Sequence, residues 1–226
     1  MLTLDAIERI EIALKSEIDC GLSADFGSDW YDNGKFEFDK KLRADIDNSL
    51  RRVRDRKADH KSGGGEGRHR VIDELTFGQM ARLYEAMPDE LKDEIASSQY
   101  TTRARTMASC LRSMTRVRNI AAHHEKLWDV RLITPPEVPN QIIKQFGGAR
   151  LPSDYVTTYY AQSLVIYFLL RHIARNTSWH RRLYELMTGE GSKVLAGLVA
   201  GQMGFPEKWA TKPFWNQQSG IVPEPA

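Results

Sequence analysis

The sequence has 226 residues, of which 41% are hydrophobic and 27% charged, as expected for a soluble globular protein that can bury a core. Its two cysteines, Cys20 and Cys110, imply no disulfide framework and favour a reducing compartment. The longest apolar run, near residues 164–170, is too short to cross a bilayer, and the amphipathic N-terminus does not resemble a signal peptide, so we expect a cytoplasmic protein without membrane association.

The net charge of +2 conceals an uneven distribution along the chain. Residues 51–70 contain eight Lys and Arg against three acidic residues, and residues 101–124 contain five Arg and no acidic residue. Concentrated positive charge favours a polyanionic partner such as nucleic acid. Two basic faces that are merely solvated would give the same pattern, so charge alone does not decide whether the protein binds a polyanion.

Helical periodicity dominates from the N-terminus, and no useful stretch alternates with a period of two, so we expect an all-α fold in a single domain over residues 1–226. A first helix is predicted over 3–20 and a second over about 36–56. The interval 51–70 is predicted as a flexible basic loop, because each of its consecutive glycines costs a helix about 1 kcal/mol relative to alanine.

The next helices begin at recognisable start signals. Thr76 is a predicted N-cap for a helix over 77–87, and Pro88 suits the first turn of a short helix over 88–97. Residues 203–226 are predicted as an irregular aromatic tail. The remaining helices are predicted over 101–131, 153–175, 178–188 and 191–202.

The predicted helix over 101–131, which would be the longest, has an apolar face and a polar face. At about 100° per residue, its buried side runs from Met107 to Trp128. Arg118 falls at one edge of that apolar face and His124 at the other, and Arg118 there needs a partner or a phosphate. The opposite side carries a polar stripe formed by Arg105, Arg112, Arg116, Asn119 and His123.

These residue types suit the cleavage of RNA. Arginine binds phosphate with two parallel hydrogen bonds and stays charged, and histidine transfers protons near neutral pH. RNA carries its own nucleophile, the 2′-OH, so a site that supplies proton transfer and charge stabilisation needs no metal or other cofactor. A metal site at His123 and His124 is disfavoured, because neighbouring helical residues diverge by about 100°.

The run Arg118-Asn119-Ile120-Ala121-Ala122-His123 resembles the Arg–x4–6–His signature of HEPN ribonucleases, which is a weak motif by itself. Its wider context, VRNIAAHHEKLW at 117–128, resembles the Abi-like (abortive infection) family. So do LDAIERIEIAL at 4–14, LTFG at 75–78 and MGFP at 203–206. Members of that family usually carry a further N-terminal segment, so a short member, a misassigned start and a fragment all stay open.

The resemblance implies a HEPN-like helical bundle with additional C-terminal helices, which dimerises and brings two Arg–His motifs to one cleft. Arg118 would stabilise the phosphorane, His123 would move the proton and Asn119 would orient the phosphate. On an ideal helix, however, Arg118 and His123 lie about 140° apart and Arg116 lies closer to His123. Arg116 and His124 are therefore kept as second-choice catalytic residues.

The resulting hypothesis is a toxin-like, metal-independent endoribonuclease in phage defence, acting as a homodimer and restrained by an RNA or protein antitoxin. The first alternative is a non-catalytic RNA-binding or scaffold HEPN module, and the second is a helical dimer that serves only protein interaction. RNA contacts are predicted for Arg51, Arg52, Arg54, Arg105, Arg112 and Arg116.

Overall fold

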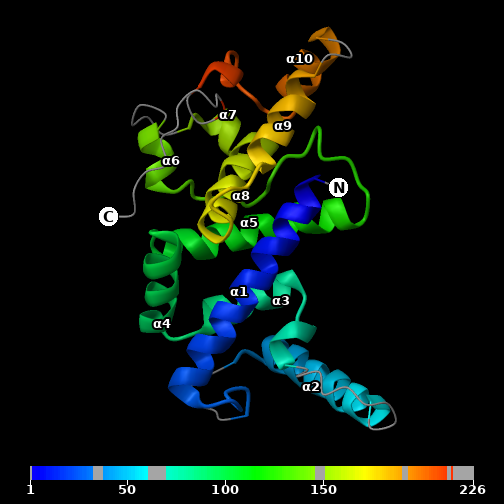
Figure 1. Ribbon diagram of the computed structural model, residues 1–226, viewed down its shortest axis with the longest axis vertical. Coiled ribbons are helices and arrows are strands. Elements are labelled where there is room, and N and C mark those ends of the chain that lie inside the picture. Colours follow the sequence, from blue (N-terminus) through cyan, green and yellow to red (C-terminus); the bar gives the residue numbers. More distant parts are fainter. Residues whose placement is uncertain are drawn as a thin grey trace. The chain divides into compact units, whose positions relative to one another are not determined.

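The computed structural model describes residues 2–32, 38–60, 70–145, 151–189, 193–212 and 215 (Figure 1). Within these ranges the regular secondary structure is helical and no strand occurs, which confirms the all-α prediction. None of the helices in these ranges is both long and apolar enough to cross a membrane.

The chain forms two compact units, one of residues 11–111 and one that combines residues 1–10 with residues 112–226. The boundaries fall inside two helices, α1 (Leu2–Phe26) and α5 (Ala104–Ala122). We refer to them as the 11–111 unit and the terminal unit. A single domain over 1–226 remains a prediction.

The 11–111 unit contains α2 (Lys40–His60), α3 (Phe77–Ala86) and α4 (Asp89–Glu94). Thr76 caps α3 as predicted. Its hydroxyl accepts a hydrogen bond from the Gln79 backbone N–H at 3.4 Å, and the Gln79 side chain accepts one from the Thr76 N–H at 2.8 Å. Asp45 of α2 accepts from the Gln79 side chain at 2.8 Å and pairs with Arg82, so these polar contacts hold α3 against α2.

Two short segments complete the helical structure of this unit. A 3-10 turn, Val71–Glu74, follows α2 in the described chain, and a π-helical turn, Ile95–Gln99, continues α4. Such π turns are uncommon and occur frequently near functional sites.

The terminal unit is built around α8 (Tyr159–Ile173), in which every residue from Tyr159 to Ile166 is buried. It also contains α6 (Asn140–Gln145), α7 (Ser153–Val156), α9 (Trp179–Thr188) and α10 (Lys193–Gln202). Ser113 of α5 donates a buried hydrogen bond to the side chain of Gln162 at 2.7 Å. A polar contact inside an apolar core fixes the register of α5 on α8, because slippage would leave both groups unpaired.

An aromatic cluster packs beside α8 and includes Tyr160, Phe205, Trp209 and Trp215. Ring centroids lie 5.0 Å apart for Tyr160 and Phe205 and 4.7 Å apart for Phe205 and Trp209. The described part of the predicted tail is therefore irregular and aromatic but packed, and it includes one more 3-10 turn, Trp209–Thr211. Residues 213–214 and 216–226 lie outside the described residues.

Several predicted boundaries were wrong. The helix predicted over 153–175 is broken between α7 and α8 at Thr157 and Thr158, and α6 was not predicted. The second helix, predicted over about 36–56, continues as α2 to His60, so residues 51–60 of the predicted loop over 51–70 are helical. Residues 61–69, the rest of the predicted basic loop apart from Arg70, lie outside the described residues.

Candidate functional site

The face that α5 presents to solvent agrees with the predicted polar stripe. Arg105, Arg112, Arg116, Asn119 and His123 are all exposed. On the other side of the helix, Met107, Cys110, Leu111, Met114, Val117 and Ile120 are buried. The division follows from the 3.6-residue period of the helix, which the sequence already displayed.

The helix ends nine residues before the predicted boundary at 131. The backbone N–H of Glu125 donates to the Ile120 carbonyl at 2.9 Å, and that of His124 donates to the Ala121 carbonyl at 3.3 Å. His124 adopts a left-handed conformation with φ of 56°. These three features form a Schellman motif, which closes a helix by satisfying its last carbonyl groups. The prediction of a helix through Trp128 was therefore wrong.

His123 is the first residue after α5 and remains attached to it. Its backbone N–H donates to the Asn119 carbonyl at 3.0 Å, and its side chain is exposed. Within the described residues, no hydrogen bond or ion pair involves the side chains of Arg116, Asn119, His123 or His124, so all four are accessible to a ligand.

Arg118 has a different environment from these residues. It is half-buried, and its Nε atom is buried with no hydrogen-bond partner in the described part of the chain. Burial of an unpaired guanidinium N–H is unfavourable, so this group favours the approach of an acceptor such as a phosphate oxygen. Arg118 and His123 therefore differ in exposure, one half-buried and the other exposed.

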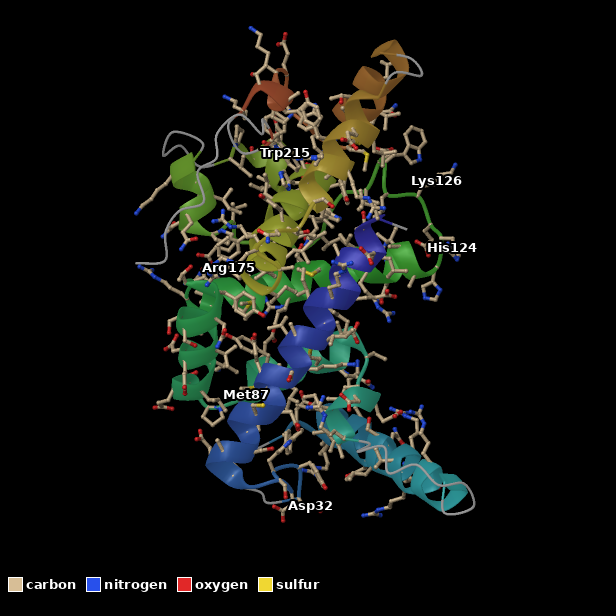
Figure 2. The ribbon with its side chains drawn as sticks, in the orientation of Figure 1. Asp32, Met87, His124, Lys126, Arg175 and Trp215 are labelled. Carbon is tan, nitrogen blue, oxygen red and sulfur yellow. The ribbon has the colours of Figure 1, made fainter. Side chains whose placement is uncertain are left out.

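The segment that follows α5 carries exposed aromatic and aliphatic groups. Trp128 is 40% exposed and Ile133 is 94% exposed, so the prediction that Trp128 anchors the core was wrong. Lys126 Nζ lies 5.9 Å from the centroid of the Trp128 ring. Figure 2 shows His124 and Lys126 on this segment, next to the end of α5. An exposed Trp beside a Lys is suited to stacking on a nucleic-acid base.

Two of the three α2 residues predicted to contact RNA, Arg51 and Arg52, have partners within the 11–111 unit, and so does the neighbouring Arg56. Arg52 pairs with Glu74 at 3.3 Å and Arg56 pairs with the same carboxylate at 2.6 Å. Arg51 donates to the side chain of Asn48. Through these contacts Arg52 and Arg56 hold α2 against the 3-10 turn.

The other predicted contact residues differ in what surrounds them. Arg54 lines a cavity of about 610 Å³ together with Asp19, Tyr31 and Asp32. Arg105 and Arg112 are exposed on α5, but each already takes part in an interaction. Among the predicted RNA-contacting arginines, Arg116 is therefore the one on α5 with no partner within the described residues.

Sequence reasoning missed Glu17, a half-buried carboxyl group of α1. Burial raises the pKa of Glu17 to about 7, against the opposing effect of a hydrogen bond from the Tyr100 hydroxyl at 3.3 Å. Glu17 lies beside the π-helical turn and lines a cavity of about 490 Å³. Its position at i, i+3 from Leu14 on an amphipathic helix gave no signal, because partial burial depends on the packing of other segments.

The described residues contain no group of three or more His, Cys, Asp or Glu side chains placed to hold a metal ion. The exposed histidine and arginine side chains at the end of α5 are of the types that can transfer protons and bind anionic groups.

Comparison with known proteins identifies the family. A family model described as Abi-like protein matches residues 1–129, which is more than half of the chain and includes the whole run from Arg118 to His123. No curated protein and no solved structure matches the chain. The chain belongs to the Abi-like protein family.

Proposed function

We propose that this Abi-like protein is a metal-independent endoribonuclease of HEPN type that acts in abortive infection, the defence in which infected cells arrest before phage can spread. The observation that carries the proposal is the end of α5. There His123 and Asn119 are exposed, and Arg118, on a different side of the helix end, is half-buried with an Nε that has no partner in the described chain. This is the residue set that the cleavage of RNA by its own 2′-OH requires.

In the proposed reaction the 2′-OH attacks the adjacent phosphorus atom. The new O2′–P bond forms as the P–O5′ bond breaks, the 2′-OH proton passes to the His123 imidazole, and the leaving O5′ takes a proton from the imidazolium of His123 or of its copy in the dimer. His123 is the proton carrier, and Arg118 stabilises the charge that develops on the phosphorane. Asn119 positions the phosphate. The products carry a 2′,3′-cyclic phosphate and a 5′-OH.

Two copies of the chain would resolve the separation between Arg118 and His123. Because these residues occupy different sides of one helix end, we propose a homodimer in which each motif complements the other. The exposed Trp128 and Ile133 that follow α5 support an association of this kind, since exposed apolar groups near a site mark interaction surfaces. An RNA or protein antitoxin would restrain the enzyme until infection.

The proposal is tested by incubating purified protein with single-stranded RNA in the presence of EDTA. His123→Ala should lower the rate by about 10²–10⁴-fold, the usual effect of removing a positioned acid–base group. Arg118→Ala should also lose cleavage, whereas Arg116→Ala, the matched removal of an exposed arginine from the same helix, should mainly weaken binding. Loss of cleavage in EDTA, or unchanged cleavage by His123→Ala, would contradict the mechanism.

The non-catalytic alternative is a module that binds RNA through the same helix end. It is favoured by the exposed Trp128 beside Lys126, because stacking on a base requires no chemistry. Binding of RNA that depends on Trp128, with no 2′,3′-cyclic phosphate product from any RNA tested, would support this alternative over the enzyme.

A further inference from the structure

A second basic site lies in the terminal unit, at the turn between α8 and α9. A cavity of about 440 Å³ opens there, lined by residues 174–178 of the turn, by Asp5 and Arg9 of α1, and by Trp179 and Arg182 of α9. Figure 2 shows Arg175 well apart from His124 at the end of α5. The cavity is therefore separate from the site proposed for RNA cleavage.

The charge of the cavity lining is strongly positive. Three arginines line it, namely Arg9, Arg175 and Arg182, against one acidic residue, Asp5. Asp5 pairs with Arg9 at 3.6 Å in an exposed contact. Arg175 and Arg182 have no side-chain hydrogen bond or ion pair within the described residues, so no acidic side chain in that part of the chain compensates their charges. Several guanidinium groups around one cavity attract an anion.

Neutral groups in the same lining supply further hydrogen-bond donors. Asn176, Thr177 and Ser178 form the turn, and α9 begins directly after it. Ser178 makes no side-chain bond to the helix that it precedes, so its hydroxyl is available. The positive end of the helix dipole adds to the potential of the arginines.

The wall of the cavity is held in place before any ligand arrives. The Trp179 side chain is buried, and its indole N–H donates to the Leu2 carbonyl at 3.0 Å, which ties the start of α9 to the start of α1. The backbone N–H of Thr177 donates to the Ala174 carbonyl at 2.9 Å and closes the turn. A rigid wall lowers the entropic cost of binding, because little has to be ordered when the ligand enters.

We propose that this cavity binds the phosphate group of a nucleotide, carried either by an RNA strand or by a free nucleotide. Arginine recognises phosphate through paired hydrogen bonds, and the lining offers this from two residues that have no competing partner. The volume is in the range of sites for small organic ligands and exceeds what a bare phosphate needs, which favours a nucleotide. The site does not depend on the proposed cleavage, since its role is to bind.

The experiment measures binding of a fluorescent 5′-phosphorylated oligonucleotide of 2′-O-methyl RNA, which has no free 2′-OH and so resists cleavage. Arg182→Gln should weaken binding about tenfold, the loss expected for a charge-assisted hydrogen bond, and should reduce the slope of log affinity against log salt by about 0.7. Arg181→Gln is the matched control. It removes the same charge from the adjacent exposed residue of α9, which does not line the cavity.

A second variant, which should bind the oligonucleotide more tightly, also tests whether this cavity is the binding site. Asp5→Asn removes the only acidic group of the lining and releases Arg9, so binding should strengthen severalfold. Both partners of the Asp5–Arg9 pair are about half exposed, and such helical pairs contribute little to stability. The fold should therefore persist, which thermal unfolding checks.

Three probes distinguish the source of the phosphate. Dependence on the 5′-phosphate assigns a strand terminus, equal binding of the 5′-OH oligonucleotide assigns an internal phosphodiester, and displacement by AMP assigns a free nucleotide. Each supports the site provided that Arg182→Gln weakens binding and Arg181→Gln does not. Equal effects of the two substitutions, or none from either, would overturn the proposal by leaving only diffuse surface charge.

Discussion

The backbone conformation at the end of α5 leads to a prediction about His124. It distinguishes a role of His124 in ending the helix from a role in catalysis. With φ of 56°, His124 occupies the position of a Schellman motif at which glycine is usual. A residue with a Cβ atom in this conformation lowers the free energy of unfolding by roughly 1–2 kcal/mol. Replacement by glycine removes that strain, but it also stabilises the unfolded chain by about 0.4–1 kcal/mol through added conformational entropy. His124→Gly should therefore raise the free energy of unfolding by about 0.5–1 kcal/mol.

The matched variants extend the test. Asparagine tolerates the left-handed region, so His124→Asn should be nearly neutral, whereas the β-branched side chain of His124→Val should lower the free energy of unfolding by about 1–2 kcal/mol. Urea unfolding followed by circular dichroism measures these differences as shifts of the unfolding midpoint. The midpoint should be highest for the glycine variant, intermediate for the asparagine variant and the parent, and lowest for the valine variant. A valine variant as stable as the parent, or a glycine variant less stable than it, would refute the argument from backbone strain.

RNA cleavage by the same variants assigns the role of the side chain. If His123 carries the proton, His124→Gly should cleave RNA at nearly the parental rate while being more stable. A fall of about 10²–10⁴-fold in a variant that is more stable than the parent would instead move the role of proton carrier from His123 to His124.

Three further predictions follow from other parts of the structure. The pKa of Glu17 is raised to about 7, so the folded chain binds this proton more tightly than the unfolded chain does, and the associated stability is complete below about pH 4.5 and lost as pH rises through 7. After discounting for partial exposure, Glu17→Gln should raise the free energy of unfolding at pH 8 by about 1–2 kcal/mol and flatten its dependence between pH 4.5 and 7, and an unchanged pH profile from urea titrations would contradict this. Gly204→Ala would place a Cβ atom 2.1 Å from Thr158 Oγ1, on a backbone with φ of 78°, so thermal unfolding should show a loss of about 3 kcal/mol, and a loss below 1 kcal/mol would show that Thr158 moves aside easily. Trp128→Ala should change stability by less than about 0.5 kcal/mol but weaken RNA binding about tenfold, and anisotropy titrations showing equal affinity would exclude a stacking role.

The sequence by itself was sufficient for the features that depend on short-range order. The 3.6-residue period determined the helical class, the buried face of α5 and its exposed stripe from Arg105 to His123. Thr76 and Gln79, three residues apart, determined where α3 begins, because a capping box is formed by neighbours in the chain. The run from Arg118 to His123 likewise needed no tertiary information to be noticed.

Only the tertiary structure decided where α5 ends and which groups converge from distant parts of the chain. No glycine or proline marks the turn at His124, so the periodic pattern predicted a helix that continues to Trp128, which is in fact exposed. The cavity lined by Arg9, Arg175 and Arg182 joins residues that lie far apart in the sequence. The physical reason is the same in each case: periodicity and capping act over a few residues, whereas burial, strain and the meeting of charges are set by packing between segments that the sequence separates.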